Sequence, residues 1–335
     1  MQQRVFIIAE AGVNHNGSLE MAKQLVDEAA RAGADAVKFQ TFRAEALVSR
    51  QTPKAAYQQQ TTAADESQFD MIRRLELSPE AHRELIAHCR TAGIQFLSSP
   101  FDLGSIDLLA ELDLQVFKIP SGEITNLPYL RKVGRLGKRT ILSTGMATMA
   151  EIAAALEVLQ GAGVGRDQLT VLHCNTEYPT PMEDVNLRAM LSIREEFGVA
   201  VGYSDHTLGT EVAVAAVALG ATLIEKHFTL DRNLPGPDHR ASLDPSGLLE
   251  MVAAIRNIEA ALGDGVKRPS ASESKNRPLV RKAIVAARNI AAGELLDEPC
   301  LTVMRPAQGL NPMLWDEVVG QPAKRKFRAG EPIEL

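Results

Sequence analysis

The sequence predicts a (β/α)₈ barrel, the TIM-barrel fold, followed by a small β-rich domain. Three observations lead to this prediction. Eight short runs rich in β-branched residues alternate with amphipathic stretches of helical length. The first run is not followed by the glycine-rich turn of a nucleotide-binding open sheet. Polar side chains follow nearly every run, as they do at the catalytic end of a barrel.

The expected strands cover residues 5–9, 36–40, 95–98, 116–119, 140–143, 169–173, 199–203 and 222–225. Strands that are separated by helices pair in parallel, and eight such units close most simply into a barrel. An open doubly wound sheet is the alternative. It is disfavoured because AEAGVNHNG stands where a GxGxxG turn would follow the first strand.

Start and stop signals bound the expected helices. Ser18 is a candidate N-cap and Gly33 a candidate C-terminal stop for the first helix. Ser78 and Pro79 open a second helix, which ends at Gly93. Further helices are expected to begin at about residues 104, 127, 148, 186, 209 and 245.

A polar segment rich in Gly, Pro and Ser, residues 263–278, separates two regions of the chain. We expect a barrel over 1–263, a linker over 264–280 and a β-rich domain over 281–335. Short apolar runs with turn signals predict the strands of this last domain.

Composition restricts the class of protein. The net charge of −6 gives no reason to expect a nucleic-acid partner. No stretch reaches the roughly 18 apolar residues of a membrane span. No targeting segment precedes the first strand, and the three cysteines form no CxxC motif. We therefore expect a cytoplasmic protein that does not bind membranes.

Catalytic groups of (β/α)₈ barrels lie at the carboxyl ends of the strands. The polar residues at these positions are Glu10, Asn14, Lys38, Gln40, Ser99, Lys118, Ser121, Glu123, Ser143, Thr144, Asn175, Glu177, Tyr178, Asp205, His206, Glu225, Lys226 and His227. A barrel built only for stability has no use for so many polar side chains at one end.

Two of these residues, Lys38 and Lys118, are lysines within apolar strands (AVKFQ and VFKIP). A buried ammonium needs a partner, and a phosphorylated or carboxylated substrate would serve both. The alternative is an internal ion pair with Glu123, Glu225 or Glu10. A third possibility is a Schiff-base lysine, since a desolvated lysine can act as a nucleophile.

His206 and His227 end the seventh and eighth strands, which are neighbours in a barrel. Two imidazoles there can share a divalent cation and leave positions open for water and substrate oxygens. Glu10 lies on the first strand, beside the eighth, and strengthens this interpretation. Either histidine alone would more often be a hydrogen-bonded core residue. Asp238, in a stiff proline-containing loop, is a candidate for gripping substrate or for a simple turn.

The same residues belong to motifs that resemble those of the sialic acid synthase (nonulosonate synthase) family. These motifs are AEAGVNHNGS, VKFQTF, SSPFD, FKIPSGE, ILSTGM, LHCNTEYPTP, VGYSDHT and EKHFTLDRNLPGPDH, in chain order. RKAIVAARNIAAGE and VMRPAQG resemble the antifreeze-like (SAF) domain that follows the barrel in that family. The resemblance covers essentially the whole chain, and as an ordered set the motifs are highly specific.

The resemblance implies a transferase that condenses phosphoenolpyruvate (PEP) with an N-acetylated hexose to give a nine-carbon α-keto acid and phosphate. Such acids serve cell-surface polysaccharide biosynthesis. It also implies a divalent metal, typically Mn²⁺, with Mg²⁺ or Co²⁺ also suitable. It further implies a homodimer in which the SAF domain is swapped onto the partner's barrel.

Carried onto this sequence, the resemblance makes His206 and His227 the metal ligands and Glu10 a catalytic carboxylate near the reacting carbons. The PEP-binding positions are Lys38, Gln40, Lys118, Ser121 and Ser143. The sugar-gripping positions are Glu123, Tyr178, Asp238 and, from the SAF domain, Arg305. Glu123 and both lysines also count among the catalytic candidates, and Ser99, Thr144, Asn175 and Thr176 among the substrate-binding ones.

The sequence departs from the family's usual residues at two positions. Ser99 stands where threonine is common in the family, and Thr176 stands where neuraminate synthases often have another residue. Together with the segment from Tyr57 to Gln68, Thr176 favours 2,4-diacetamido-2,4,6-trideoxymannose, which would give N,N′-diacetyllegionaminate. An N-acetylneuraminate synthase that uses N-acetylmannosamine is the alternative. A Schiff-base aldolase is the alternative of another class, and a non-catalytic barrel is disfavoured because the whole set of polar residues is present.

Overall fold

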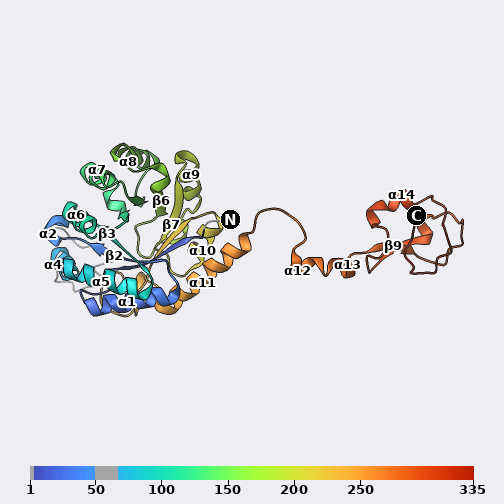
Figure 1. Ribbon diagram of the computed structural model, residues 1–335, viewed down its shortest axis with the longest axis horizontal. Coiled ribbons are helices and arrows are strands. Elements are labelled where there is room, and N and C mark those ends of the chain that lie inside the picture. Colours follow the sequence, from blue (N-terminus) through green and yellow to red (C-terminus); the bar gives the residue numbers. More distant parts are fainter. Residues whose placement is uncertain (1–3, 50–66) are drawn as a thin grey trace. The chain divides into compact units, whose positions relative to one another are not determined.

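The computed structural model describes residues 4–49 and 67–335, which form two compact units, Met1–Gly263 and Asp264–Leu335 (Figure 1). Most of the segment Tyr57 to Gln68, which bears on the choice of sugar, lies outside the described residues.

The first unit contains eight parallel strands in the order β3-β2-β1-β8-β7-β6-β5-β4. The end strands β3 and β4 contact each other and close the sheet. The strands are β1 Phe6–Gly12, β2 Ala36–Thr41, β3 Gln95–Pro100, β4 Val116–Ile119, β5 Arg139–Ser143, β6 Leu169–Cys174, β7 Ala200–Asp205 and β8 Leu223–His227. The predicted (β/α)₈ architecture is confirmed.

Helices follow the strands and surround the sheet (Figure 1). They are α1 Leu19–Ala32, α2 Ala44–Leu47, α4 Gln68–Arg74, α5 Pro79–Ala92, α6 Leu103–Glu111, α7 Leu127–Arg135, α8 Met149–Ala162, α9 Arg188–Phe197, α10 Glu211–Ala218 and α11 Pro245–Leu262. The expected caps are present. The Ser18 side chain accepts a hydrogen bond from the Met21 amide, and Gly33 ends α1 in the left-handed conformation.

The barrel interior has two layers, because side chains alternate along each strand. Its floor is apolar and consists of Ile8, Ala36, Leu97, Ile141, Leu172 and Leu223. Two residues farther along these six strands stand Glu10, Lys38, Ser99, Ser143, Cys174 and Glu225. The main apolar core lies between the strands and the helices, where α1, for example, buries Leu25 and Val26. The strands therefore present a polar layer on an apolar floor.

The second unit contains the short helices α12 Ala271–Ser274, α13 Arg277–Val280 and α14 Trp315–Val318 and an antiparallel pair of strands, β9 Ala283–Ala286 and β10 Leu301–Met304. Its own apolar core includes Ile284, Leu296, Val318 and Phe327. Across both units, none of the described helices is long and apolar enough to cross a membrane.

Candidate active site

A cavity of about 190 Å³ opens at the carboxyl ends of the strands in the first unit. The predicted site residues that line it are Glu10, Lys38, Gln40, Ser99, Lys118, Ser121, Ser143, Thr176, Tyr178, His206 and His227. The barrel thus brings together eleven of the sixteen predicted site residues, from strands far apart in the sequence. Their individual roles remain predictions.

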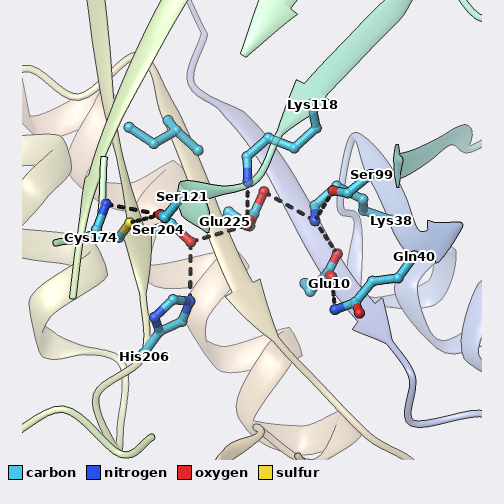
Figure 2. A network of polar contacts seen from close by, with 12 residues as sticks. Glu10, Lys38, Gln40, Ser99, Lys118, Ser121, Cys174, Ser204, His206 and Glu225 are labelled. Atoms are coloured by element: carbon cyan, nitrogen blue, oxygen red, sulfur yellow. Dashed lines mark hydrogen bonds and ion pairs between the residues drawn. The ribbon is translucent and has the colours of Figure 1, made fainter. Parts of the chain in front are cut away.

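Both lysines are buried and lie against carboxylates in a chain of alternating charge (Figure 2). Lys38 Nζ lies 2.8 Å from Glu10 Oε2 and 3.6 Å from Glu225 Oε2, and it donates to Ser99 Oγ at 3.0 Å. Lys118 Nζ lies 3.2 Å from Glu225 Oε1. The internal ion pairs considered from the sequence therefore exist with Glu10 and Glu225. They do not exclude an anionic ligand, because an entering phosphate can contact the same ammonium groups.

Burial and charge act in opposite directions on these groups. Burial raises the pKa of Glu10 to about 7, although the nearby Lys38 ammonium pulls it down. The pKa of Glu225 is held at about 2, because Lys118 and Lys38 outweigh the effect of its burial. The carboxylates raise the pKa of Lys38, whereas burial lowers that of Lys118. Glu10 is therefore suited to exchange a proton near neutral pH.

The two histidine rings lie next to each other in the cavity, with centroids 5.4 Å apart and ring planes inclined by 64°. His206 Nε2 lies 3.1 Å from the Tyr178 hydroxyl and 3.3 Å from Ser204 Oγ, and His206 Nδ1 contacts the Asn175 carbonyl. Burial lowers the pKa of His206 to about 4, and it lowers the pKa of His227 well below its ordinary value. Both imidazoles are therefore neutral at pH 7 and have lone pairs to donate.

These histidines fit a divalent cation as a two-nitrogen donor set. His227 Nδ1 is buried and has no hydrogen-bond partner among the described residues, which leaves a nitrogen lone pair unused. Within the same described ranges, no group of three or more His, Cys, Asp or Glu side chains is arranged to hold a metal. A cation held by His206 and His227 would therefore need further ligands from substrate or water.

The loop after β5 holds Ser121 in the wall of the cavity. Its hydroxyl accepts from the Gly145 amide at 2.9 Å and lies 3.3 Å from Cys174 Sγ. A Cβ on Gly145 would approach Thr176 Cγ2 to 2.6 Å. This loop therefore positions Ser121 and Thr176 through a close backbone approach that only glycine allows.

Five predicted site residues lie outside this cavity lining. Thr144 Oγ1 donates to the Leu172 carbonyl, and Asn175 Oδ1 accepts from the Glu177 amide. Both line a neighbouring cavity of about 630 Å³. The remaining three are Glu123, whose carboxylate accepts from Asn126 at 2.6 Å, Asp238, which is buried after β8, and Arg305, which is exposed at the end of β10 in the second unit.

Among the residues that line the cavity, Ser204, Glu225 and Cys174 carry a polar or sulfur atom and had no predicted catalytic or binding role, although Glu225 was named at its strand end. Ser204 and Glu225 lie two positions before His206 and His227 on the same strands, so the alternation of side chains could have located them. Ser204 donates to Glu225 Oε1 at 3.1 Å. Cys174 precedes the predicted Asn175 and faces inward in its place. Conversely, Asp205 and Lys226 pair with each other and do not line the cavity.

Comparison with protein-family models identifies both units. Residues 25–267 match the model of the NeuB family, and residues 281–335 match that of the SAF domain. The chain belongs to the NeuB family. The resemblance to sialic acid synthases that the motifs indicated is thereby confirmed, as is the SAF domain at the C-terminal end.

Named relatives and a solved structure agree with this assignment. An N,N′-diacetyllegionaminic acid synthase of Campylobacter jejuni is 54% identical over 99% of both chains. A Legionella pneumophila protein of the same name is 45% identical over 98% of this chain and 93% of its own. The crystal structure of an N-acetylneuraminic acid synthetase from Leptospira borgpetersenii is 33% identical, with a TM-score of 0.72 over 82% of this chain and 90% of that one.

Proposed function

We propose that this NeuB-family chain condenses PEP with 2,4-diacetamido-2,4,6-trideoxymannose to give N,N′-diacetyllegionaminate and phosphate. The observation that carries this proposal is the pair of buried lysines beside Glu10 and the two histidines in one cavity. The named relatives at 54% and 45% identity favour this sugar over N-acetylmannosamine, since the neuraminate synthetase is only 33% identical.

The side chains that line the cavity have separate roles in the proposed reaction. Lys38 and Lys118 bind the phosphate and carboxylate of PEP, and the Ser121 and Ser143 hydroxyls add hydrogen bonds to its oxygens. PEP C3 forms the new bond to the aldehyde carbon, water adds at PEP C2, and phosphate leaves. Glu10 exchanges a proton with the reacting oxygens. A divalent cation such as Mn²⁺, held by His206 and His227, would supply Lewis-acid polarisation of the aldehyde.

A direct assay tests the choice of sugar. The purified full-length chain is incubated with PEP and either the 2,4-diacetamido sugar or N-acetylmannosamine, and phosphate release is followed. We expect kcat/KM to be higher for the diacetamido sugar. A higher value for N-acetylmannosamine would establish the alternative, N-acetylneuraminate synthase.

The metal site has a separate test. His227→Ala should abolish activity and weaken Mn²⁺ binding in calorimetry, while the melting temperature of the barrel changes little. Normal turnover by this variant would contradict the metal site. EDTA should also inactivate the chain, whereas a Schiff-base aldolase acting through Lys118 would survive EDTA and be trapped by borohydride.

The second unit suggests a partner. We infer from the SAF-domain match that the chain forms a homodimer with swapped SAF domains. In that dimer Arg305, which is exposed at the end of β10, contacts the N-acyl group of a sugar bound in the partner's barrel. We also propose that the chain acts in the cytoplasm.

A further inference from the structure

A buried ion pair that faces away from the cavity joins β7 to β8. Lys226 Nζ lies 2.8 Å from Asp205 Oδ2, and the side chains are only 1% and 0% exposed. The two residues are direct partners in the parallel register of these strands. In sequence, the pair falls between the inward-facing Ser204 and Glu225 and the two histidines that follow.

Thr207 completes this arrangement. Lys226 Nζ also donates to the Thr207 carbonyl at 2.6 Å. The second carboxylate oxygen of Asp205 accepts from the Thr207 amide at 2.9 Å and from its hydroxyl at 2.7 Å. The residues on both sides of His206 are therefore bound to Lys226, which immediately precedes His227: Asp205 through its carboxylate and Thr207 through its carbonyl. We call Asp205, Thr207 and Lys226 the strand clamp.

Stability alone does not account for the strand clamp. Removing two charges from water is costly, and well-packed apolar residues often stabilise such a position as well or better. An ion pair with three further hydrogen bonds instead holds these side chains in a single geometry. The clamp therefore restricts how the ends of β7 and β8 lie relative to each other.

His227 depends on this restriction more than His206 does. His206 Nδ1 contacts the Asn175 carbonyl, which orients its ring. His227 Nδ1 has no such partner in the described part of the chain. The orientation of the His227 ring thus relies on its backbone and on its edge-to-face contacts with Tyr178 and His206. Lys226 anchors that backbone from the opposite face of the strand.

We propose that Asp205, Thr207 and Lys226 are positioning residues that hold the His206 and His227 imidazoles at the separation a divalent cation requires. The inference rests on the proposed metal site. It predicts that breaking the strand clamp weakens metal binding in a chain that still folds.

The test compares two charge-neutral double variants of the full-length chain. Asp205→Asn with Lys226→Met removes the clamp's ion pair and keeps the side chains at similar size. The matched control, Asp35→Asn with Arg256→Met, removes a 2.7 Å ion pair at the amino-terminal end of the barrel, where Asp35 also accepts from the Ile7 amide. Mn²⁺ affinity is measured by titration calorimetry, the Mn²⁺ environment by electron paramagnetic resonance, and folding by circular dichroism.

We expect the clamp variant to bind Mn²⁺ about 10- to 100-fold more weakly, with an altered resonance spectrum, and the control to bind it like the wild type. Wild-type Mn²⁺ affinity in the folded clamp variant, or equal weakening in both variants, overturns the inference. A wild-type chain that binds no Mn²⁺ overturns the metal site itself, and the inference with it. If the double variant does not fold, Thr207→Val provides a milder change that removes only the hydroxyl donor. Unchanged Mn²⁺ affinity in that variant would also overturn the inference.

Discussion

Four charged side chains, Glu10, Lys38, Glu225 and Lys118, are buried in the interior of the barrel. Their charges alternate, so each ammonium contacts at least one carboxylate. Truncating Lys38 would leave Glu10 buried without its ion-pair partner, and truncating Glu225 would do the same to Lys118, which typically costs about 3–5 kcal/mol. An arriving anion can therefore use lysines that are already held in place, at little further cost in side-chain entropy.

Glu10 provides the most direct test of proton transfer. Glu10→Gln keeps the shape of the side chain but removes a carboxyl group whose pKa lies at about 7. We expect kcat to fall about 10²- to 10⁴-fold, because a positioned acid–base group contributes on that order. Circular dichroism should show an unchanged fold. Glu84→Gln, at an exposed carboxylate on α5, is the control, and turnover of Glu10→Gln within threefold of wild type would contradict the role.

Gly145 tests the close approach that positions Ser121 and Thr176. In Gly145→Ala the new Cβ would lie 2.6 Å from Thr176 Cγ2 and 2.9 Å from Ser121 Oγ, so the wall must shift. We expect the KM for PEP to rise and the free energy of unfolding to fall by about 1–3 kcal/mol. Gly161→Ala, on α8 with nothing within 4 Å, should leave KM unchanged. An unchanged KM in Gly145→Ala would remove this loop from substrate binding.

The loops that follow β1 and β8 bury histidines of their own. Burial lowers the pKa of His15 and of His239 to about 4. His239 is hydrogen-bonded to Thr229 Oγ1 at 2.6 Å and to Asn16 Oδ1 at 3.2 Å, so the ring joins the two loops. Protonation of either ring therefore opposes the folded conformation of these loops.

The stability of this region should therefore depend on pH. The pKa of His15 is lower in the folded chain than in the unfolded one, so the unfolded chain takes up the proton first. The resulting stabilisation is complete above about pH 6.5 and is lost as the pH falls toward about 4, by roughly 3 kcal/mol per imidazole. Chemical denaturation at several pH values measures this slope.

The variant His15→Gln should reduce the slope over that range. Phe39→Leu is the control, because Phe39 packs near the His15 ring but the substitution retains every imidazole. This variant should be less stable at every pH, while the dependence of its stability on pH stays that of the wild type. An identical slope in His15→Gln and wild type would contradict the contribution of His15.

At the scale of the whole molecule, the two units have separate apolar cores. The barrel unit contains the cavity with both lysines and both histidines, so PEP binding should depend on that unit alone. The second unit contributes the SAF domain and Arg305. The proposed dimer divides the two substrates between the units, with PEP in the barrel and part of the sugar against Arg305 of the partner subunit.

This division predicts an unequal effect of Arg305→Ala. We expect the KM for the sugar to rise at least tenfold, because the proposed charge-assisted hydrogen bond to the N-acyl oxygen would be lost, while the KM for PEP changes little. Steady-state kinetics with each substrate varied in turn measures both constants. Arg288→Ala, at an exposed arginine in the same unit that pairs with Glu294, is the control. An unchanged KM for the sugar would exclude Arg305 from the site.

The sequence by itself determined the order of strands and helices, the caps of α1 and α5, and the set of polar residues at the strand ends. These features are local: strand periodicity, capping and short motifs are read within a few residues. The same motifs also identified the family. Membership of that family specifies the reaction more narrowly than the chemistry of single residues does.

Only the tertiary structure decided which of these polar residues share the cavity. Glu225 lies between two lysines that are more than one hundred positions away from it in the sequence. The Thr144 hydroxyl donates a hydrogen bond to the Leu172 carbonyl. Asp205 and Lys226 lie at strand ends yet pair on the outer face. The register of a closed barrel sets these contacts, because a shift of one residue along a strand turns each side chain to the opposite face.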